Sequence, residues 1–349
     1  MAARRRNAGV ALLVVLALAL ALLTAAFTPW SDDLRGPEGG LVAAPLSPSD
    51  PPALRLAAAG DVGTGGTAEL ATAAAMEKSA EERPFDALVL LGDNVYPSGD
   101  PARLEATVFG PFGPVLDAGA ELVAVLGNHD VRQGNGNAQA AALGMPGRWY
   151  ARRLGPVLLI ALDSTRADDP DQRAWLEQTL AGATEEWKIV ALHHPPYSAG
   201  EHGSDEQVRE TFAPLFSRYG VQLVLAGHDH DYQRSVPIDG VTYVVSGGAA
   251  KLRSTGRASF TAVSWSAYHF VDVALWPDRL QLRAIGHDGL VYDEATIPRR
   301  PAGRALPVGC GELTGLASTS RRPTAPARLS LRVCWLCHHT RTQRWDRAP

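Results

Sequence analysis

The chain has 349 residues, which is enough for one large domain with additional segments. Hydrophobic residues make up 46% and charged residues 20%, as in a soluble globular protein with a sizeable core. The formal net charge of −4 is unevenly distributed, because residues 299–349 hold ten arginines against only Glu312 and Asp346. The rest of the chain is therefore acidic. This argues against nucleic acid as a partner, since a phosphate backbone is bound through many Lys and Arg side chains.

The first 27 residues have the pattern of an export segment. Arginines at positions 4 to 6 precede a continuous apolar stretch from Ala8 to Phe27, and a basic region followed by an apolar one is typical of a signal peptide. A stretch of about 20 apolar residues also suffices to span a bilayer. Residues 1–27 are therefore predicted to be a signal peptide or an N-terminal membrane anchor. Both alternatives predict an extracytoplasmic protein, secreted or anchored, that contacts the membrane only through this segment if it is not cleaved.

The middle of the chain alternates between strand and helix patterns. Residues 28–53 are rich in Pro, Gly, Ser and Asp and are predicted to form a flexible linker. Short apolar runs then predict strands over residues 54–59, 87–91, 121–126, 156–162, 188–192, 221–226 and 241–246. Helical patterns predict helices over residues 67–82, 170–180 and 205–219. This alternation predicts an α/β fold.

The last part of the predicted domain has a different pattern of apolar runs. Apolar runs at residues 270–275, 280–285 and 290–297 are joined by short turns, which is typical of antiparallel hairpins. One domain over residues 54–298 is therefore predicted to close with antiparallel strands. Residues 299–349 are predicted to be a basic, disordered tail. The tail holds all three cysteines, and Cys334, Cys337 and His338 match the attachment pattern of c-type haem, although no fold that could enclose a haem is predicted around them.

Five short motifs each place a polar side chain at the end of an apolar run. The motifs are Gly60-Asp61-Val62-Gly63, Gly92-Asp93-Asn94-Val95-Tyr96, Gly127-Asn128-His129-Asp130, Val190-Ala191-Leu192-His193 and Gly227-His228-Asp229-His230. In open α/β sheets, ligand sites form beyond the carboxyl ends of the strands. The motifs are therefore predicted to meet along one edge of the fold.

The side chains of these motifs are suited to binding metal. Their oxygen and nitrogen donors, without a thiolate, favour Fe, Mn or Zn. The set is large enough for two adjacent cations, and Asp93 has two oxygens with which to bridge them. Tyr96 is unusual, because a phenol must lose a proton of pKa about 10 to bind a metal, and a trivalent cation such as Fe(III) favours that loss. In an acidic protein, the metals would also supply the positive charge needed to bind a phosphate group.

The ordered motifs resemble those of the purple acid phosphatases, specifically the small, tartrate-resistant type, within the calcineurin-like metallophosphoesterase superfamily. The resemblance runs from about Leu56 to Ser246 and implies an α/β sandwich of two β-sheets flanked by helices. Other branches of the superfamily usually carry a His two residues after the first Asp. That position is Gly63 here, and Tyr96 takes its place.

The resemblance implies a dinuclear centre with Fe(III) and a second, divalent metal, which is Fe, Zn or Mn. The ligands that it implies for Fe(III) are Asp61, Asp93, Tyr96 and His230. The ligands that it implies for the divalent metal are Asp93, Asn128, His193 and His228.

The resemblance also implies the activity of an exported acid phosphatase, which hydrolyses small phosphate monoesters by attack of a metal-activated hydroxide. His202 is implied as the general acid and His129 as the residue that orients the phosphate. His194 follows a ligand and is expected to point to the opposite side, as a packing residue or as a residue that supports the ligands. Asp130 and Asp229 are expected to be hydrogen-bond partners of the histidines.

Two alternatives remain open from the sequence. A phosphodiesterase on the same scaffold would differ in its pocket walls, which the motifs do not describe. A non-catalytic, surface-anchored binding protein is expected to lack some of the ligands, and none is missing from the motifs. The sequence leaves the oligomeric state open.

Overall fold

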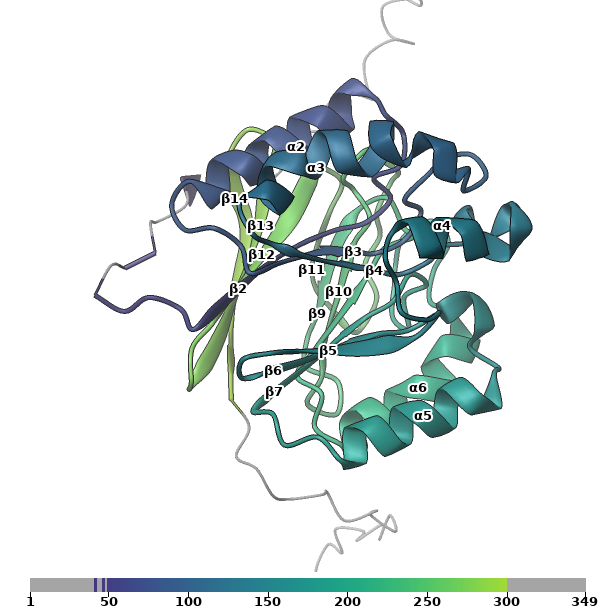
Figure 1. The fold of residues 1–349 in the computed structure, drawn as a ribbon. Coiled ribbons are helices and arrows are strands. Elements are labelled where there is room, and N and C mark those ends of the chain that lie inside the picture. Colours follow the sequence, from purple (N-terminus) through teal and green to yellow (C-terminus); the bar gives the residue numbers. More distant parts are fainter. Residues whose placement is uncertain (1–40, 43–45, 48, 300–349) are drawn as a thin grey trace, which may run out of the picture. The chain divides into compact units, whose positions relative to one another are not determined.

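The computed structural model describes residues 41–42, 46–47 and 49–299 (Figure 1). The predicted export segment over residues 1–27, and the tail from residue 300 with its Cys334, Cys337 and His338 motif, lie outside the described residues. In the part of the chain that is described, no helix is long and apolar enough to cross a membrane.

One seven-stranded sheet contains the first predicted strands and the C-terminal hairpins. Its strands, in spatial order, are β1 (Leu41–Val42), β14 (Leu290–Pro298), β13 (Arg279–Gly286), β12 (His269–Leu275), β2 (Leu54–Ala59), β3 (Ala87–Leu90) and β4 (Glu121–Ala124). β2, β3 and β4 are parallel, and the remaining pairs are antiparallel. β1 belongs to the segment predicted as a linker, so this short part of it is paired to the sheet.

The second seven-stranded sheet is formed by the middle of the chain. Its strands, in spatial order, are β11 (Thr261–Trp265), β9 (Tyr232–Ser235), β10 (Thr242–Ser246), β8 (Leu223–Ala226), β7 (Trp187–Ala191), β6 (Val157–Ala161) and β5 (Tyr150–Leu154). The central strands β10, β8, β7 and β6 are parallel, whereas β5, β9 and β11 pair antiparallel at the two sides.

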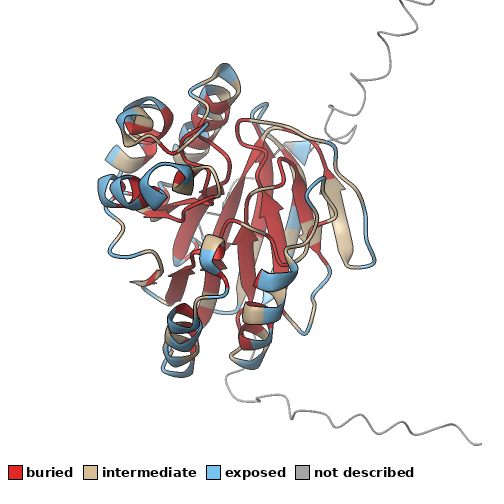
Figure 2. Ribbon diagram, turned by 90° about the vertical axis from the view of Figure 1, so that its right-hand side faces the viewer, coloured by how far each residue is buried: buried red, intermediate tan, exposed pale blue. Residues whose placement is uncertain are grey.

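The sheets pack face to face, and helices cover their outer faces (Figures 1 and 2). The helices α2 (Thr67–Ala80) and α3 (Gly110–Asp117) cover the first sheet, and α5 (Pro170–Ala181) and α6 (Glu206–Arg218) cover the second. Strand β2 shows the alternation that this layering requires. Leu54, Leu56 and Ala58 pack between the sheets, while Ala57 and Ala59 pack under the helices. The predicted two-sheet α/β sandwich is confirmed.

The predicted strands and helices form with ends within two residues of those expected. The sequence patterns missed β1, β5, β9 and β11, the helices α3 and α4 (Asn137–Ala142), and short helical turns in the loops. These turns are η1 (Pro101–Arg103), η2 (Glu105–Phe109), η3 (Asp130–Arg132), η4 (Gly134–Gly136) and η5 (Ser164–Arg166). Most of the missed elements lie at sheet edges or in the loops that carry the site.

A buried ionic cluster lies between the first sheet and α2. Arg55 on β2 donates two hydrogen bonds of 3.0 Å to the carboxylate of Asp272 on β12, which also accepts a 3.2 Å bond from Arg283 on β13. All three side chains are almost completely buried. The Arg55 guanidinium also lies over the ring of Phe85 and donates to the carbonyl of Ser79. The cluster therefore ties three strands to the helix layer above them.

Replacing Asp272 with Asn is expected to destabilise the fold by at least about 3 kcal/mol, because two buried guanidinium groups lose their counter-charge. The measurement is the free energy of unfolding from urea denaturation. Asp278→Asn is the matched control, since the Asp278–Arg279 pair is exposed and exposed pairs contribute little. Equal unfolding midpoints for the two variants would contradict the prediction.

Candidate metal centre

The predicted ligands all lie in loops that follow parallel strands. Asp61 follows β2, Asp93 and Tyr96 follow β3, Asn128 follows β4, His193 follows β7, and His228 and His230 follow β8. The two sheet edges touch at Gly60, where a Cβ atom would lie 3.0 Å from the Gly227 Cα and 2.8 Å from the Ser246 carbonyl oxygen. Because no side chain separates the sheets there, ligands from both sheets reach one site.

The first group of donors is centred on the hydroxyl of Tyr96. This hydroxyl donates a 2.9 Å hydrogen bond to Asp61 Oδ1 and lies 3.2 Å from His230 Nε2. The same Asp61 oxygen is 3.3 Å from His230 Nε2. All three side chains are buried. Three potential ligand atoms, from the ends of β2, β3 and β8, therefore converge on one point.

The second group of donors is centred on His193. Its Nδ1 lies 2.8 Å from the carbonyl oxygen of Leu91, and because a carbonyl only accepts, Nδ1 carries the proton and Nε2 keeps its lone pair. That Nε2 atom is 3.1 Å from Asn128 Oδ1 and 3.6 Å from Asp93 Oδ1. Donor atoms of Asp61, Asp93 and His193 all lie within 4.8 Å of one another, so Asp93 is within reach of both groups.

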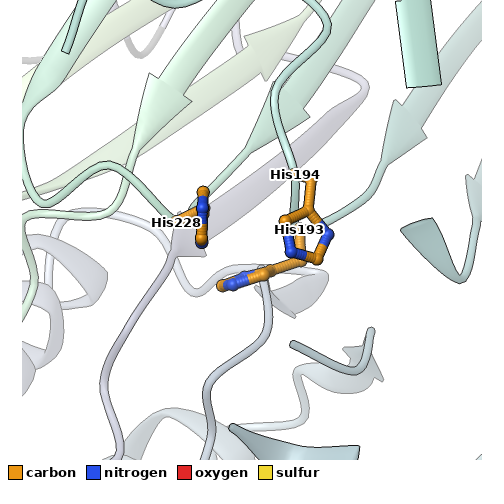
Figure 3. A group of neighbouring side chains, drawn as sticks. All are labelled: His193, His194 and His228. Carbon is orange, nitrogen blue, oxygen red and sulfur yellow. The ribbon is translucent and has the colours of Figure 1, made fainter. Parts of the chain in front are cut away.

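His228 faces His193 and His194 across the site (Figure 3). Its ring centroid is 5.1 Å from that of His193 and 4.6 Å from that of His194, and these three residues form a second set with ligand atoms within 4.8 Å. The expectation that His194 points away is therefore wrong. The chain is no longer extended after β7, so neighbouring side chains do not alternate.

The loop around Tyr96 occupies the space beside the first carboxylate. The Gly63 carbonyl accepts a 2.8 Å hydrogen bond from the Tyr96 amide, and the Gly63 amide donates a 3.0 Å bond to the Asp93 carbonyl. A Cβ atom on Gly63 would lie only 2.4 Å from the Val95 nitrogen. A side chain at position 63 is thus incompatible with this loop, because its Cβ would clash with the backbone of Asn94 and Val95.

Comparison with known proteins agrees with this geometry. Residues 54–232, just over half of the chain, match the calcineurin-like phosphoesterase family. The chain belongs to this family. Mouse tartrate-resistant acid phosphatase type 5 is 27% identical over 301 residues, which cover 72% of this phosphoesterase and 92% of the mouse protein.

Solved structures share the fold of this phosphoesterase. A purple acid phosphatase from yellow lupin seeds superposes with a TM-score of 0.64 at 20% identity, covering 73% of this chain and 55% of the lupin chain. An anchor protein of the Plasmodium inner membrane complex superposes with a TM-score of 0.62 at 18% identity, covering 71% and 89%. The resemblance to purple acid phosphatases is confirmed. The protein is a metal-dependent phosphoric ester hydrolase, and its relatives imply a dinuclear metal centre.

The electrostatics of the phosphoesterase site suit cations. Burial, and then the charge of Asp93, raises the pKa of Asp61 well above its usual range. Burial, followed by the neighbouring His193, lowers the pKa of His228 to about 2, and burial followed by Arg253 lowers that of His230 to about 4. The imidazoles are therefore neutral with lone pairs available, and adjacent buried carboxylates lack a counter-charge. This donor set fits two bound cations.

The phenol fits a cation of high charge. Burial, and then the charges of Asp61 and Asp93, raises the pKa of Tyr96 far above its usual value. Ionisation of this hydroxyl therefore requires a strong electrophile at the point where Asp61 and His230 also converge.

His129 lies beside Tyr96 with its ring fixed. Its Nδ1 lies 2.8 Å from the Pro97 carbonyl oxygen, so Nε2 faces Asp93, 4.0 Å from Oδ2, with Arg132 Nη2 3.3 Å away. The ring centroid is 4.7 Å from that of Tyr96. An imidazole held in this way can contact a group bound next to Asp93.

His202 lies on the opposite side of the site. Its ring stacks on that of His228 with a centroid distance of 4.4 Å, and its amide donates a 2.8 Å hydrogen bond to Asp229 Oδ1. The side chain is exposed, so its nitrogen atoms are open to a bound substrate and to solvent.

Asp130 and Asp229, which directly follow His129 and His228 in the motifs, accept hydrogen bonds from backbone amides. Asp130 accepts from the amides of Asn94, Val95 and Gly127 at 3.1, 3.1 and 2.9 Å, and Asp229 accepts from the amide of His202. Asp229 is therefore a hydrogen-bond partner of a histidine, through the His202 amide, whereas Asp130 holds amides of other residues. Asp130 instead locks the loops after β3 and β4 together.

Three residues near the site were not among the predicted site residues, and two of them, Arg132 and Lys251, carried no sequence signal. His194 could have been found only from its adjacency to His193. Arg132 lies two residues after the Gly127–Asp130 motif, and Lys251 lies in the loop between β10 and β11 with its Nζ 3.6 Å from the centroid of the Tyr96 ring.

Proposed function

We propose that this phosphoesterase is a purple-type acid phosphatase that hydrolyses small phosphate monoesters with Fe(III) and a second, divalent metal, Fe, Zn or Mn. The observation that carries the proposal is the buried Tyr96 hydroxyl, 2.9 Å from Asp61 Oδ1 and 3.2 Å from His230 Nε2. A phenol in that position is a ligand for a hard, trivalent cation, because only such a cation makes its ionisation favourable.

The two groups of donors define the proposed ligands. The Fe(III) ligands are Asp61, Asp93, Tyr96 and His230, and the ligands of the divalent metal are Asp93, Asn128, His193 and His228. The proximity of Asp93 to both groups supports its role as the shared ligand. The contacts of His194 with His193 and His228 favour a supporting role for His194 at the divalent site.

When bound, the two cations supply Lewis-acid polarisation of the phosphate and a water of lowered pKa. The remaining steps belong to the chain. With Nδ1–H bonded to the Pro97 carbonyl, the imidazolium form of His129 donates its Nε2–H to a phosphate oxygen and orients it. His202, exposed and stacked on His228, donates the proton to the leaving oxygen.

The purified protein is expected to be coloured, with a phenolate-to-Fe(III) charge-transfer band in the visible spectrum that disappears in Tyr96→Phe. The band requires the ionised ring as electron donor, and phenylalanine has no oxygen to bind the metal. Absorption spectra and elemental analysis on the same samples provide the measurement. Tyr219→Phe is the matched control, since its hydroxyl contacts Glu177 on the helix layer.

A colourless wild type containing only divalent ions would refute the Fe(III)–tyrosinate assignment and leave hydrolysis intact. Hydrolysis rates of an aryl phosphate monoester and the corresponding diester test the substrate class. A faster diester reaction would identify a phosphodiesterase on this scaffold instead. The proposed extracytoplasmic location is tested by fractionating cells that express the full chain.

A further inference from the structure

Lys251 lies against the metal-facing tyrosine. Its Nζ atom is 3.6 Å from the centroid of the Tyr96 ring, close enough for a cation–π contact. The lysine belongs to the loop between β10 and β11, whereas Tyr96 follows β3 in the other sheet. The contact therefore joins the two sheets directly at the proposed Fe(III) site.

The backbone on both sides of Lys251 is fixed. Two residues before it, the Ala249 carbonyl accepts a 2.7 Å hydrogen bond from Thr72 Oγ1 on α2. Two residues after it, the Arg253 amide donates a 2.9 Å bond to the His230 carbonyl. Lys251 itself is partly buried. The side chain thus starts from a fixed point next to a proposed ligand, unlike a freely rotating surface lysine.

The Lys251 ammonium acts on the Asp61 carboxyl at longer range, where its positive charge opposes the rise in the pKa of that group that burial causes. Within the described ranges, no Asp or Glu lies within ion-pair distance of its ammonium group. The nearby Arg253 differs, because its guanidinium is paired with Glu201 at 3.1 Å. The ammonium of Lys251 therefore faces the Tyr96 ring without a close ion-pair partner, whereas Glu201 partly compensates the charge of Arg253.

We propose that Lys251 tunes the metal centre by stabilising the ionised Tyr96 ring and weakening its donation of electrons to the bound Fe(III). This inference rests on the proposed function, because it requires a tyrosinate ligand. A positive charge acts most strongly on the nearest negative charge, and the ring is nearer to Lys251 than a metal bound at the hydroxyl oxygen. Lys251 acts through Tyr96 and is a positioning residue, with no contact to substrate required.

Two observable consequences follow. The charge-transfer transition moves an electron from the ring to the metal, away from Lys251, so the lysine increases the transition energy and shortens its wavelength. Reduction of the metal adds negative charge near the lysine, so the lysine raises the reduction potential. Removing its charge is expected to reverse both effects.

The test compares visible spectra and reduction potentials of metal-loaded, full-length wild type, Lys251→Met and Lys251→Arg. Lys251→Met is expected to shift the band by about 10 nm to longer wavelength and to lower the reduction potential. Lys251→Arg keeps the charge and is expected to stay close to wild type. Arg253→Met, which removes a paired cation two residues away, is the matched control and is expected to show a smaller shift. Lys251→Gln provides a second uncharged variant if Lys251→Met does not accumulate.

The outcomes separate this inference from the proposed function. A coloured wild type whose band is unchanged in both uncharged variants, at equal iron content, overturns the role of Lys251 alone. Equal shifts in Lys251→Met and Arg253→Met also overturn it, because they indicate a general charge effect. A colourless wild type overturns the proposed iron–tyrosinate centre and this inference together.

Discussion

Asparagine in place of Asp93 is expected to remove both metals from the enzyme and to lower kcat/KM by about 10³-fold or more. The metals stabilise the transition state by several kcal/mol, and each ~1.4 kcal/mol corresponds to a tenfold change in rate. Asp93 Oδ1 is 3.6 Å from His193 Nε2 and accepts a 2.9 Å hydrogen bond from the His129 amide. Asparagine keeps the size and can keep this backbone contact. It removes the charge and one of the two oxygens that a shared ligand needs.

Metal content per chain and kcat/KM on an aryl phosphate provide the measurements for Asp93→Asn. Asp169→Asn is the matched control, because Asp169 caps α5 away from the site and asparagine is also a good N-cap. A variant that retains two metals per chain and near-wild-type turnover would show that Asp93 does not bridge the centre.

The sequence predicted the architecture because its strands have a simple physical signature. Runs such as 157–161 and 223–226 are continuously apolar, as strands covered on both faces must be. Within each sheet, parallel strands have their carboxyl ends at the same edge. Asp61, Asn128 and His193 each come directly after such a strand and therefore lie at these edges. Residue type and strand direction place these side chains at the carboxyl ends of strands in two sheets, and the approach of the sheets at Gly60 brings them together.

The missed strands β5 and β9 lacked this signature. β5 contains two consecutive arginines, Arg152 and Arg153, and its burial is partial. β9 begins at Tyr232, immediately after the loop that carries His230, so it offers only a short run before its end at Ser235. Such strands are stabilised by pairing with their neighbours: β5 forms a hairpin with β6, and β9 pairs with β10 and with β11.

The detailed orientation of the site depends on backbone that alternation rules do not describe. Asp61, Asp93 and His228 have φ values of 61°, 52° and 72°, in the left-handed region that side chains rarely adopt. A rule based on extended chain therefore fails directly after each strand, as it does for His194. The approach of Lys251 to Tyr96 is also invisible in the sequence, because it joins loops from different sheets.

His202→Ala is expected to lower kcat by about 10²-fold or more for an alkyl phosphate and much less for a nitrophenyl phosphate. An alkoxide is a poor leaving group and needs the proton that the exposed His202 ring, stacked 4.4 Å from His228, can provide. A nitrophenolate leaves readily without one. His287→Ala, which alters an exposed histidine on the β13–β14 turn, is the matched control.

His129→Ala is expected to behave differently, and the contrast distinguishes the two roles. His129 is fixed beside Asp93 with its Nε2 facing the site, so its loss should weaken phosphate binding and raise KM for both substrates alike. The dependence on leaving group therefore belongs to His202 alone. If His202→Ala slows both substrates equally while His129→Ala shows the leaving-group dependence, the two assignments must be exchanged. Proton donation would then come from the side of the site next to Tyr96, and the imidazole stacked on His228 would be the one that positions phosphate.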